Sequence, residues 1–145
     1  MTYTIVSEKI NSVVKEEVSR VASQTYTSEG VPMYDAIRIT SRDDNELSRL
    51  IAEKIDIMLS RFRVFVSSVS ADGKIIGFDL PDLPEFYIER IVLVLDRYIS
   101  MGVVSSWLRD KGNDSAQLYA ERSDDAINEA EILMMTRKSI KREGK

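Results

Sequence analysis

The sequence predicts an all-α fold, a bundle of about four helices with a minor short β element, built as a single helical domain over residues 1–145. One observation is an almost wholly apolar run at residues 86–108, which is too long for a strand. Another is that apolar residues recur with helical spacing on both sides of this run. A third is that turn residues at 28–32, 81–84 and 112–113 separate the periodic segments.

The N-terminal segment, residues 5–24, is predicted to be a helix. Its apolar stripe follows the i, i+3, i+4 rule, Glu17 alone interrupts it, and Thr4 is a plausible N-cap. The valines in the stripe lower helix propensity, so docking must hold this helix in place. Residues 25–41 lack a helical period, and the loose alternation from Asp35 to Thr40 is compatible with a short strand.

A second helix is predicted to begin at Ser41, with Asp43 and Asp44 in its first turn, where the helix dipole favours acidic side chains. Its apolar stripe then continues at helical spacing as far as Val69. The spacing alone therefore predicts a helix over residues 41–69.

The end of this segment also permits a second interpretation. Residues 63–69 are rich in β-branched and aromatic side chains, and Asp72-Gly73 is a hairpin signal before residues 74–80. We favour the long helix because its stripe is unbroken and Gly73 also suits a helix C-terminus. In that case residues 74–80 form a short extended segment that pairs with residues 37–40.

The apolar run at 86–108 is predicted to be the central helix. Asp82 can act as its N-cap, Pro84 is tolerated in a first turn, and Glu85 completes a capping-box pattern with Asp82. Gly112 marks its end. The run contains four charged residues, each of which costs roughly 3 kcal/mol at a bilayer centre, so we expect a core helix and no membrane contact.

A fourth helix is predicted after Asn113, with Asp114 as its cap and Gln117 in the capping-box position. Small residues in its apolar stripe permit close approach of a neighbouring helix. Ser105-Ser106 on the central helix either allow the same close packing or face water. Its outer face is acidic, with Glu121, Asp124, Asp125, Glu129 and Glu131.

The composition excludes several kinds of chemistry. The chain has no Cys and no His, so disulfides, thiolate zinc sites, cysteine nucleophiles and the usual serine triad are excluded. We therefore expect no enzymatic activity, metal or cofactor. The N-terminal residues lack the basic-then-apolar plan of a signal peptide, and we expect the chain to stay in the cytoplasm when it is made.

The net charge of −4 hides an asymmetry. Five basic residues oppose Glu143 within residues 137–145, a net of +4, so the rest of the chain carries −8. The basic residues at issue are Arg137, Lys138, Lys141 and Arg142, with Lys145 at the end.

The order of elements resembles that of the small helical head–tail connector (neck) proteins of tailed bacteriophages and prophages. The stretches that carry the resemblance are residues 91–98, 104–107 ending at Trp107, 113–119 with its early Tyr119, and the basic pairs Arg137-Lys138 and Lys141-Arg142. The first half is similar in plan, with Met33-Tyr34-Asp35 in a loop and an acidic-capped helix at Asp43.

This resemblance implies a virion assembly part that works between portal and tail. It implies that the partners are the chain itself, as a ring, and portal or tail proteins, and that the protein ends in the virion if it is phage-derived. A second hypothesis is a helical adaptor or regulator that binds another bacterial protein.

Two features are candidate partner-binding sites. Trp107 could anchor a partner, since Trp is enriched at binding hot spots, or it could plug the end of the bundle core. The basic residues Arg137, Lys138, Lys141 and Arg142 could contact DNA phosphates weakly or an acidic face of a ring partner. The alternative is that residues 137–145 form a loose, solvated terminus.

A third hypothesis is enzymatic. Glu16-Glu17 and Glu53 with Asp56 faintly resemble the metal-binding carboxylates of all-α nucleotide pyrophosphohydrolases. Arg20 stands where that pattern has its third Glu, and hard cations such as Mg²⁺ need several convergent oxygens. We therefore favour a solvated helix face at these positions.

Overall fold

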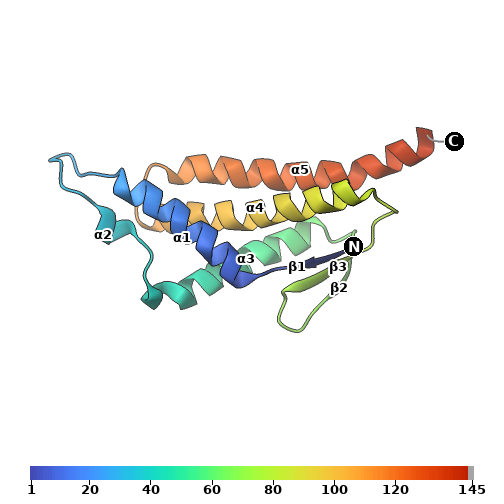
Figure 1. The fold of residues 1–145 in the computed structure, drawn as a ribbon, viewed down its shortest axis with the longest axis horizontal. Helices are drawn as coiled ribbons and strands as arrows, with labels where there is room; N and C mark the ends of the chain where they lie inside the picture. Colours follow the sequence, from blue (N-terminus) through green and yellow to red (C-terminus); the bar gives the residue numbers. More distant parts are fainter. Residues whose placement is uncertain (144–145) are drawn as a thin grey trace.

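The computed structural model describes the backbone of residues 1–143 and the side chains of residues 1–135 (Figure 1). Its long helices are α1 (Ser7–Ser23), α3 (Asp44–Arg61), α4 (Glu85–Asp110) and α5 (Ala116–Glu143), and its short ones α2 (Tyr34–Ile37) and the 3-10 turn η1 (Ser41–Asp43). Strands β1 (Thr2–Thr4), β2 (Val66–Val69) and β3 (Ile75–Phe78) form an antiparallel sheet in the order β1-β3-β2. The predicted all-α bundle of about four helices with a minor β element is confirmed.

Helix α4 lies at the centre of the bundle, as its sequence predicts. It packs against α5 over most of its length, and α1 and α3 contact its other sides (Figure 1). By length and composition alone α4 could cross a membrane, but 72% of its most apolar window is buried inside the fold. Its apolar surface is therefore mostly accounted for by packing within one chain.

The C-terminal end of α4 is held by Gly112, as predicted. Gly112 has a φ of +67°, its N–H donates to the carbonyl of Arg109, and the N–H of Asn113 donates to that of Leu108. These two bonds form a Schellman motif, which needs the left-handed conformation that glycine adopts readily. The predicted cap at the other end is wrong, because the N-cap position is Pro84 and Asp82 lies outside the helix.

The turn into α5 is held by a different residue from the one predicted. The side-chain oxygen of Asn113 accepts a hydrogen bond from the N–H of Ser115 at 2.8 Å, and α5 begins at Ala116. Gln117 donates along its own helix to Glu121 at 3.4 Å. The predicted capping box of Asp114 and Gln117 is therefore replaced by an Asn turn, a local bond that Asn makes as readily as Asp.

The long helix predicted over residues 41–69 is wrong, since α3 ends at Arg61 and the hairpin β2–β3 follows. Gly73 takes a φ of +74° at the turn, where the Asp72 carboxylate accepts bonds from the Ser70 hydroxyl and the Lys74 N–H. Hairpin formation turns Ile76 and Phe78 into the core. The burial of these two β3 side chains favours the hairpin, in which Val66–Val69 form the partner strand.

The predicted partner of the extended segment is also wrong. β3 pairs with β2 and β1, not with residues 37–40, and Tyr34–Ile37 is a short helix rather than part of a strand. Thr4 belongs to β1, so it does not cap α1, which begins at Ser7. Strand β1 is fixed by Tyr3, whose fully buried side chain donates its hydroxyl proton to Asp96 of α4 at 2.6 Å.

Candidate functional site

The seam between α4 and α5 is built from small residues, as the sequence predicts. The Ser105 hydroxyl donates to the carbonyl of Ala116 at 2.9 Å, and the Ser123 hydroxyl donates to that of Tyr98 at 2.8 Å. Side-chain bonds to the backbone of a neighbouring helix require the two helices to approach closely. These buried serines therefore serve packing, and their protons are committed to the backbone.

Trp107 lies in the core at the turn end of the bundle. Its side chain is 4% exposed, its indole N–H donates to the carbonyl of Ile37 at 2.7 Å, and Lys111 lies over its ring at 4.9 Å. Of the two alternatives for this residue, the core plug agrees with its burial. Trp107 joins α4 to the end of α2 inside one chain.

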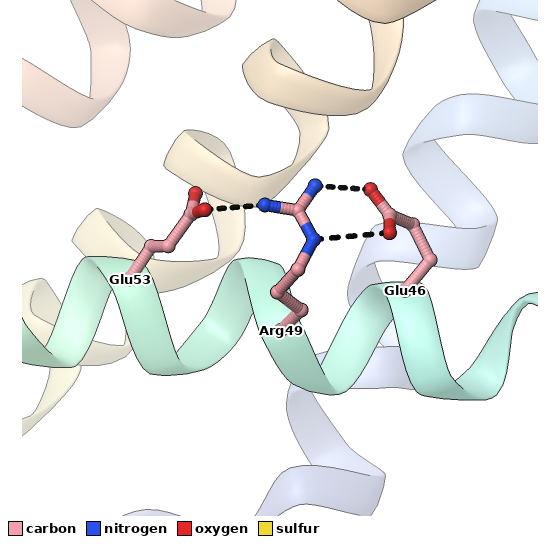
Figure 2. Close-up of polar contacts among 3 residues, drawn as sticks. All are labelled: Glu46, Arg49 and Glu53. Atoms are coloured by element: carbon pink, nitrogen blue, oxygen red, sulfur yellow. Dashed lines mark hydrogen bonds and ion pairs between the residues drawn. The ribbon is translucent and has the colours of Figure 1, made fainter.

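The acidic residues of α3 are engaged by a neighbour on the same helix. Figure 2 shows Arg49 between Glu46 and Glu53, with its guanidinium paired to both carboxylates. The hydrogen bond from Arg49 lowers the pKa of Glu46, although this carboxyl is exposed. Glu53 is thus bound by a cation one turn away, which suits a solvated helix face stabilised by i, i+4 pairs.

The acidic residues of α1 are similarly occupied. The Glu17 carboxylate accepts a hydrogen bond from the Tyr119 hydroxyl at 2.8 Å and pairs with Arg20 at 2.6 Å. Burial raises the pKa of Tyr119, and its bond to Glu17 raises it further. Within the described residues, no three or more Asp and Glu side chains converge in a way that could hold a metal ion.

Helix α5 extends past the start of α4. Contacts between Arg90 and Glu129, Tyr98 and Ser123, and Ser105 and Ala116 fix the antiparallel register, which sets Glu85 opposite the region of residue 135. The backbone of α5 continues to Glu143, about 12 Å farther at the helical rise, and Figure 1 shows this end projecting from the bundle. The side chains of the predicted contact residues Arg137, Lys138, Lys141 and Arg142 lie outside the described residues.

Large apolar side chains are exposed near this end of the molecule. Val64 is 81% exposed, Phe86 and Ile132 are each 64% exposed, and Met135 is 55% exposed. A groove of about 780 Å³ opens between Val64, Leu80 and Met135. Val64 and Met135 line this groove together, and a shared apolar surface marks interaction sites more often than isolated exposed residues do.

Sequence reasoning missed Phe86 as a surface residue because it belongs to the apolar run of the central helix. A signal was present, since Glu85 and Glu89 flank Phe86 on the first turns, where the helix meets solvent. An exposed residue of this kind can be told apart from the core residues of the helix only when the neighbouring helices are known.

Comparison of the chain with protein-family models, with curated proteins and with solved structures finds no match.

Proposed function

We propose that this protein is a structural assembly part of a tailed phage or prophage, of the head–tail connector (neck) type, which acts by protein–protein contact. The resemblance in the order of elements supports this proposal. In it, the partners are further copies of the chain in a ring and the portal or tail proteins at its two faces. The protein is cytoplasmic during assembly and becomes part of the virion.

The observation that carries the proposal is the distribution of charge along α5. Its C-terminal end holds Arg137, Lys138, Lys141 and Arg142, whereas its first half holds an acidic row of exposed residues, Glu121, Asp124 and Asp125. Among the described residues, no cation forms an ion pair with this acidic row.

A single helix cannot bring its own two ends together. Glu121 and Arg137 are about 24 Å apart along α5 at a rise of about 1.5 Å per residue. The basic end of one copy is therefore available to the acidic row of the next copy. Such a head-to-tail contact closes into a ring when its rotation permits.

Self-association tests this proposal. Light scattering of the full chain should show a mass that rises with concentration and falls at high salt, because contacts between exposed charges are screened. Deletion of residues 137–145 should reduce association without lowering the melting temperature. The matched control replaces Arg137, Lys138, Lys141 and Arg142 by Gln, which retains the length of the helix.

Two outcomes would count against the proposal. Unchanged association after both tail changes would remove the basic end from the mechanism. A chain that stays monomeric and also ignores purified portal protein would reject the connector function, and binding of one other bacterial protein would then favour an adaptor. Genes for portal and capsid proteins beside the coding gene are the expected genomic context.

A further inference from the structure

A groove of about 250 Å³ lies between α3, α4 and α5, away from the basic end of α5. Lys54 and Ile57 of α3 form one wall, Tyr98, Gly102 and Arg109 of α4 form the floor, and Asp124 of α5 lies on the far side. At about 30 Å³ per water molecule, this is room for several waters or for one aromatic ring. We call it the Lys54 groove.

The absence of a side chain at Gly102 makes room for Lys54. A Cβ atom on Gly102 would lie 3.0 Å from Oγ of Ser123 and 3.1 Å and 3.2 Å from Cδ and Cε of Lys54, closer than most such contacts. Glycine inside a helix costs about 1 kcal/mol relative to alanine, so its place here has a packing reason. The Lys54 stem lies against α4 at this point, and the backbone carbonyl of Lys54 accepts the Tyr98 hydroxyl at 3.1 Å.

The groove holds an excess of positive charge. Lys54 and Arg109 form no ion pair with any described residue, and Asp124 is the acidic residue that lines the groove. Burial lowers the pKa of Lys54, and nearby Arg109 acts in the same direction, against Glu53 and Asp124. A second carboxylate placed in the groove would relieve this repulsion.

The rim of the groove is apolar. Ile57, on the α3 wall, is 53% exposed although it is a large hydrophobic residue. The groove thus presents Lys54 and Arg109 without an ion pair to a described residue beside an aliphatic contact, while its third cation, Arg61, is paired with Glu131. The complementary surface would combine carboxylates with a large apolar side chain.

The start of α4 carries such a surface. Phe86 is 64% exposed, and Glu85 and Glu89 are exposed on either side of it without an ion pair to a described residue. The Phe86 ring stacks on that of Tyr87 with centroids 4.4 Å apart, which restricts its orientation. Aromatic residues with restricted rotamers are favoured as anchors of protein interfaces. We call Glu85, Phe86 and Glu89 the Phe86 face.

The Lys54 groove and the Phe86 face cannot meet within one molecule. Both lie on α4, where Phe86 and Gly102 are about 24 Å apart along the axis and about 160° apart around it. Each can be covered only by another molecule. Two complementary patches on opposite sides of one rigid helix form a heterologous, head-to-tail contact.

We propose that the Phe86 face of one copy docks into the Lys54 groove of the next copy, with Phe86 against Ile57 and with Glu85 and Glu89 beside Lys54 and Arg109. This inference rests on the proposed function and names an interface through which its ring would form. Asp124 of the acidic row lines the groove and is covered by this contact, whereas Glu121 and Asp125 lie outside the groove lining and stay available to the basic end of a neighbour.

Complementation by charge reversal tests this docking. Lys54→Glu blocks the groove but leaves the Phe86 face intact, and Glu85→Lys with Glu89→Lys does the reverse. Both sets are placed in the chain whose Arg137, Lys138, Lys141 and Arg142 are replaced by Gln, so that the contact of the basic end is absent. Each set alone should then remain monomeric in light scattering, because every remaining contact would need one defective patch. A mixture of the two should form a one-to-one heterodimer that grows no further.

Control variants separate this outcome from a general effect of charge. Arg63→Glu and Glu29→Lys reverse the charge of exposed residues outside both patches, and each should assemble like the wild type. Arg109→Glu is a second groove variant, for use if Lys54→Glu fails to fold. Because Arg109 is exposed, its substitution should leave the fold intact.

A cysteine crosslink gives an independent measurement because the chain has no Cys of its own. Ile57→Cys mixed with Glu85→Cys should form a disulfide between copies on oxidation, whereas Val64→Cys mixed with Glu85→Cys should not. A wild-type oligomer that the groove variants leave intact, without the crosslink, would overturn this docking but not the proposed function. A wild type that stays monomeric and gives no crosslink would overturn both.

Discussion

The two ends of the α4–α5 pair differ in how their surfaces are covered. At the turn end, Trp107 is buried and bonded to the Ile37 carbonyl, and Asn113 donates to the Thr25 hydroxyl at 3.2 Å. At the sheet end, Phe86 and Met135 are exposed, and α5 continues beyond α4. The same antiparallel helix pair is therefore stabilised by its own chain at one end and leaves apolar surface at the other.

This difference distinguishes residues that stabilise the fold from residues that are available to partners. A helix that is apolar on most faces needs cover on each of them. Within one chain, α1, α3 and α5 cover most of α4 but leave its first turns exposed at Phe86 and Leu93. Substitution of the buried Trp107 at the turn end should therefore change the free energy of unfolding, whereas substitution of the exposed Phe86 at the sheet end should change association.

The largest expected effect is at Trp107. Trp107→Ala should lower the free energy of unfolding by roughly 3–5 kcal/mol, since it removes a large buried side chain and leaves the Ile37 carbonyl without its donor. Val64→Ala, at a residue that is 81% exposed, is the control and should change it by less than about 0.5 kcal/mol. Denaturant titration measures both, and a loss below about 1 kcal/mol for Trp107→Ala would contradict its core role.

Alkaline pH should destabilise the contacts that α4 makes with β1 and α3. Burial raises the pKa of Tyr3 above its ordinary value of 10.0, and it raises the pKa of Tyr98 to about 12. Above pH 10 the unfolded chain therefore releases these protons first, and the free energy of unfolding should fall by up to about 1.4 kcal/mol per pH unit for each tyrosine. This stability is fully present below pH 10.

Tyr3→Phe sharpens this test. The variant cannot ionise at residue 3, so its free energy of unfolding should fall less steeply above pH 10 than that of the wild type. Urea titrations between pH 8 and pH 11 measure the two slopes. Equal slopes would show that Tyr3 ionises alike in the folded and unfolded states.

A smaller effect is expected at the end of α4. Gly112→Ala should lower the free energy of unfolding by about 1–2 kcal/mol, because a residue with a Cβ is disfavoured at a φ of +67°. Gly112→Asn is the matched control and should lose less, since Asn tolerates this conformation. Thermal unfolding compares the two. A Cβ atom at Gly112 would meet no atom within 4 Å, so equal losses would contradict the role given to backbone conformation.

The smallest effect on stability is expected at Phe86. Phe86→Ala should change the free energy of unfolding by less than about 1 kcal/mol, because the ring is mostly exposed, while self-association should weaken. Phe62→Ala, at a fully buried ring, should instead cost roughly 3–5 kcal/mol. A large loss of stability in Phe86→Ala would place this residue with the core rather than with the interface.

Much of the helical framework could be predicted from the sequence. The apolar run predicted α4, the small-residue stripe predicted α5, and Gly112 predicted where α4 ends. These features depend on local spacing and on backbone conformation, which neighbouring residues determine. The candidate surfaces were predicted less well, because the exposure of Phe86 and the groove at Lys54 depend on which helices lie beside α4.

What the sequence by itself determined is the helical bundle, its central helix and its separation of charge along α5. What only the tertiary structure decided is the end of α3 and the small sheet. After Phe62, helical spacing and strand propensity favour different structures, and local energies do not separate them. The sheet forms because β1, from the far N-terminus, pairs with β3 and buries Tyr3 against α4, a long-range contact that no local pattern contains.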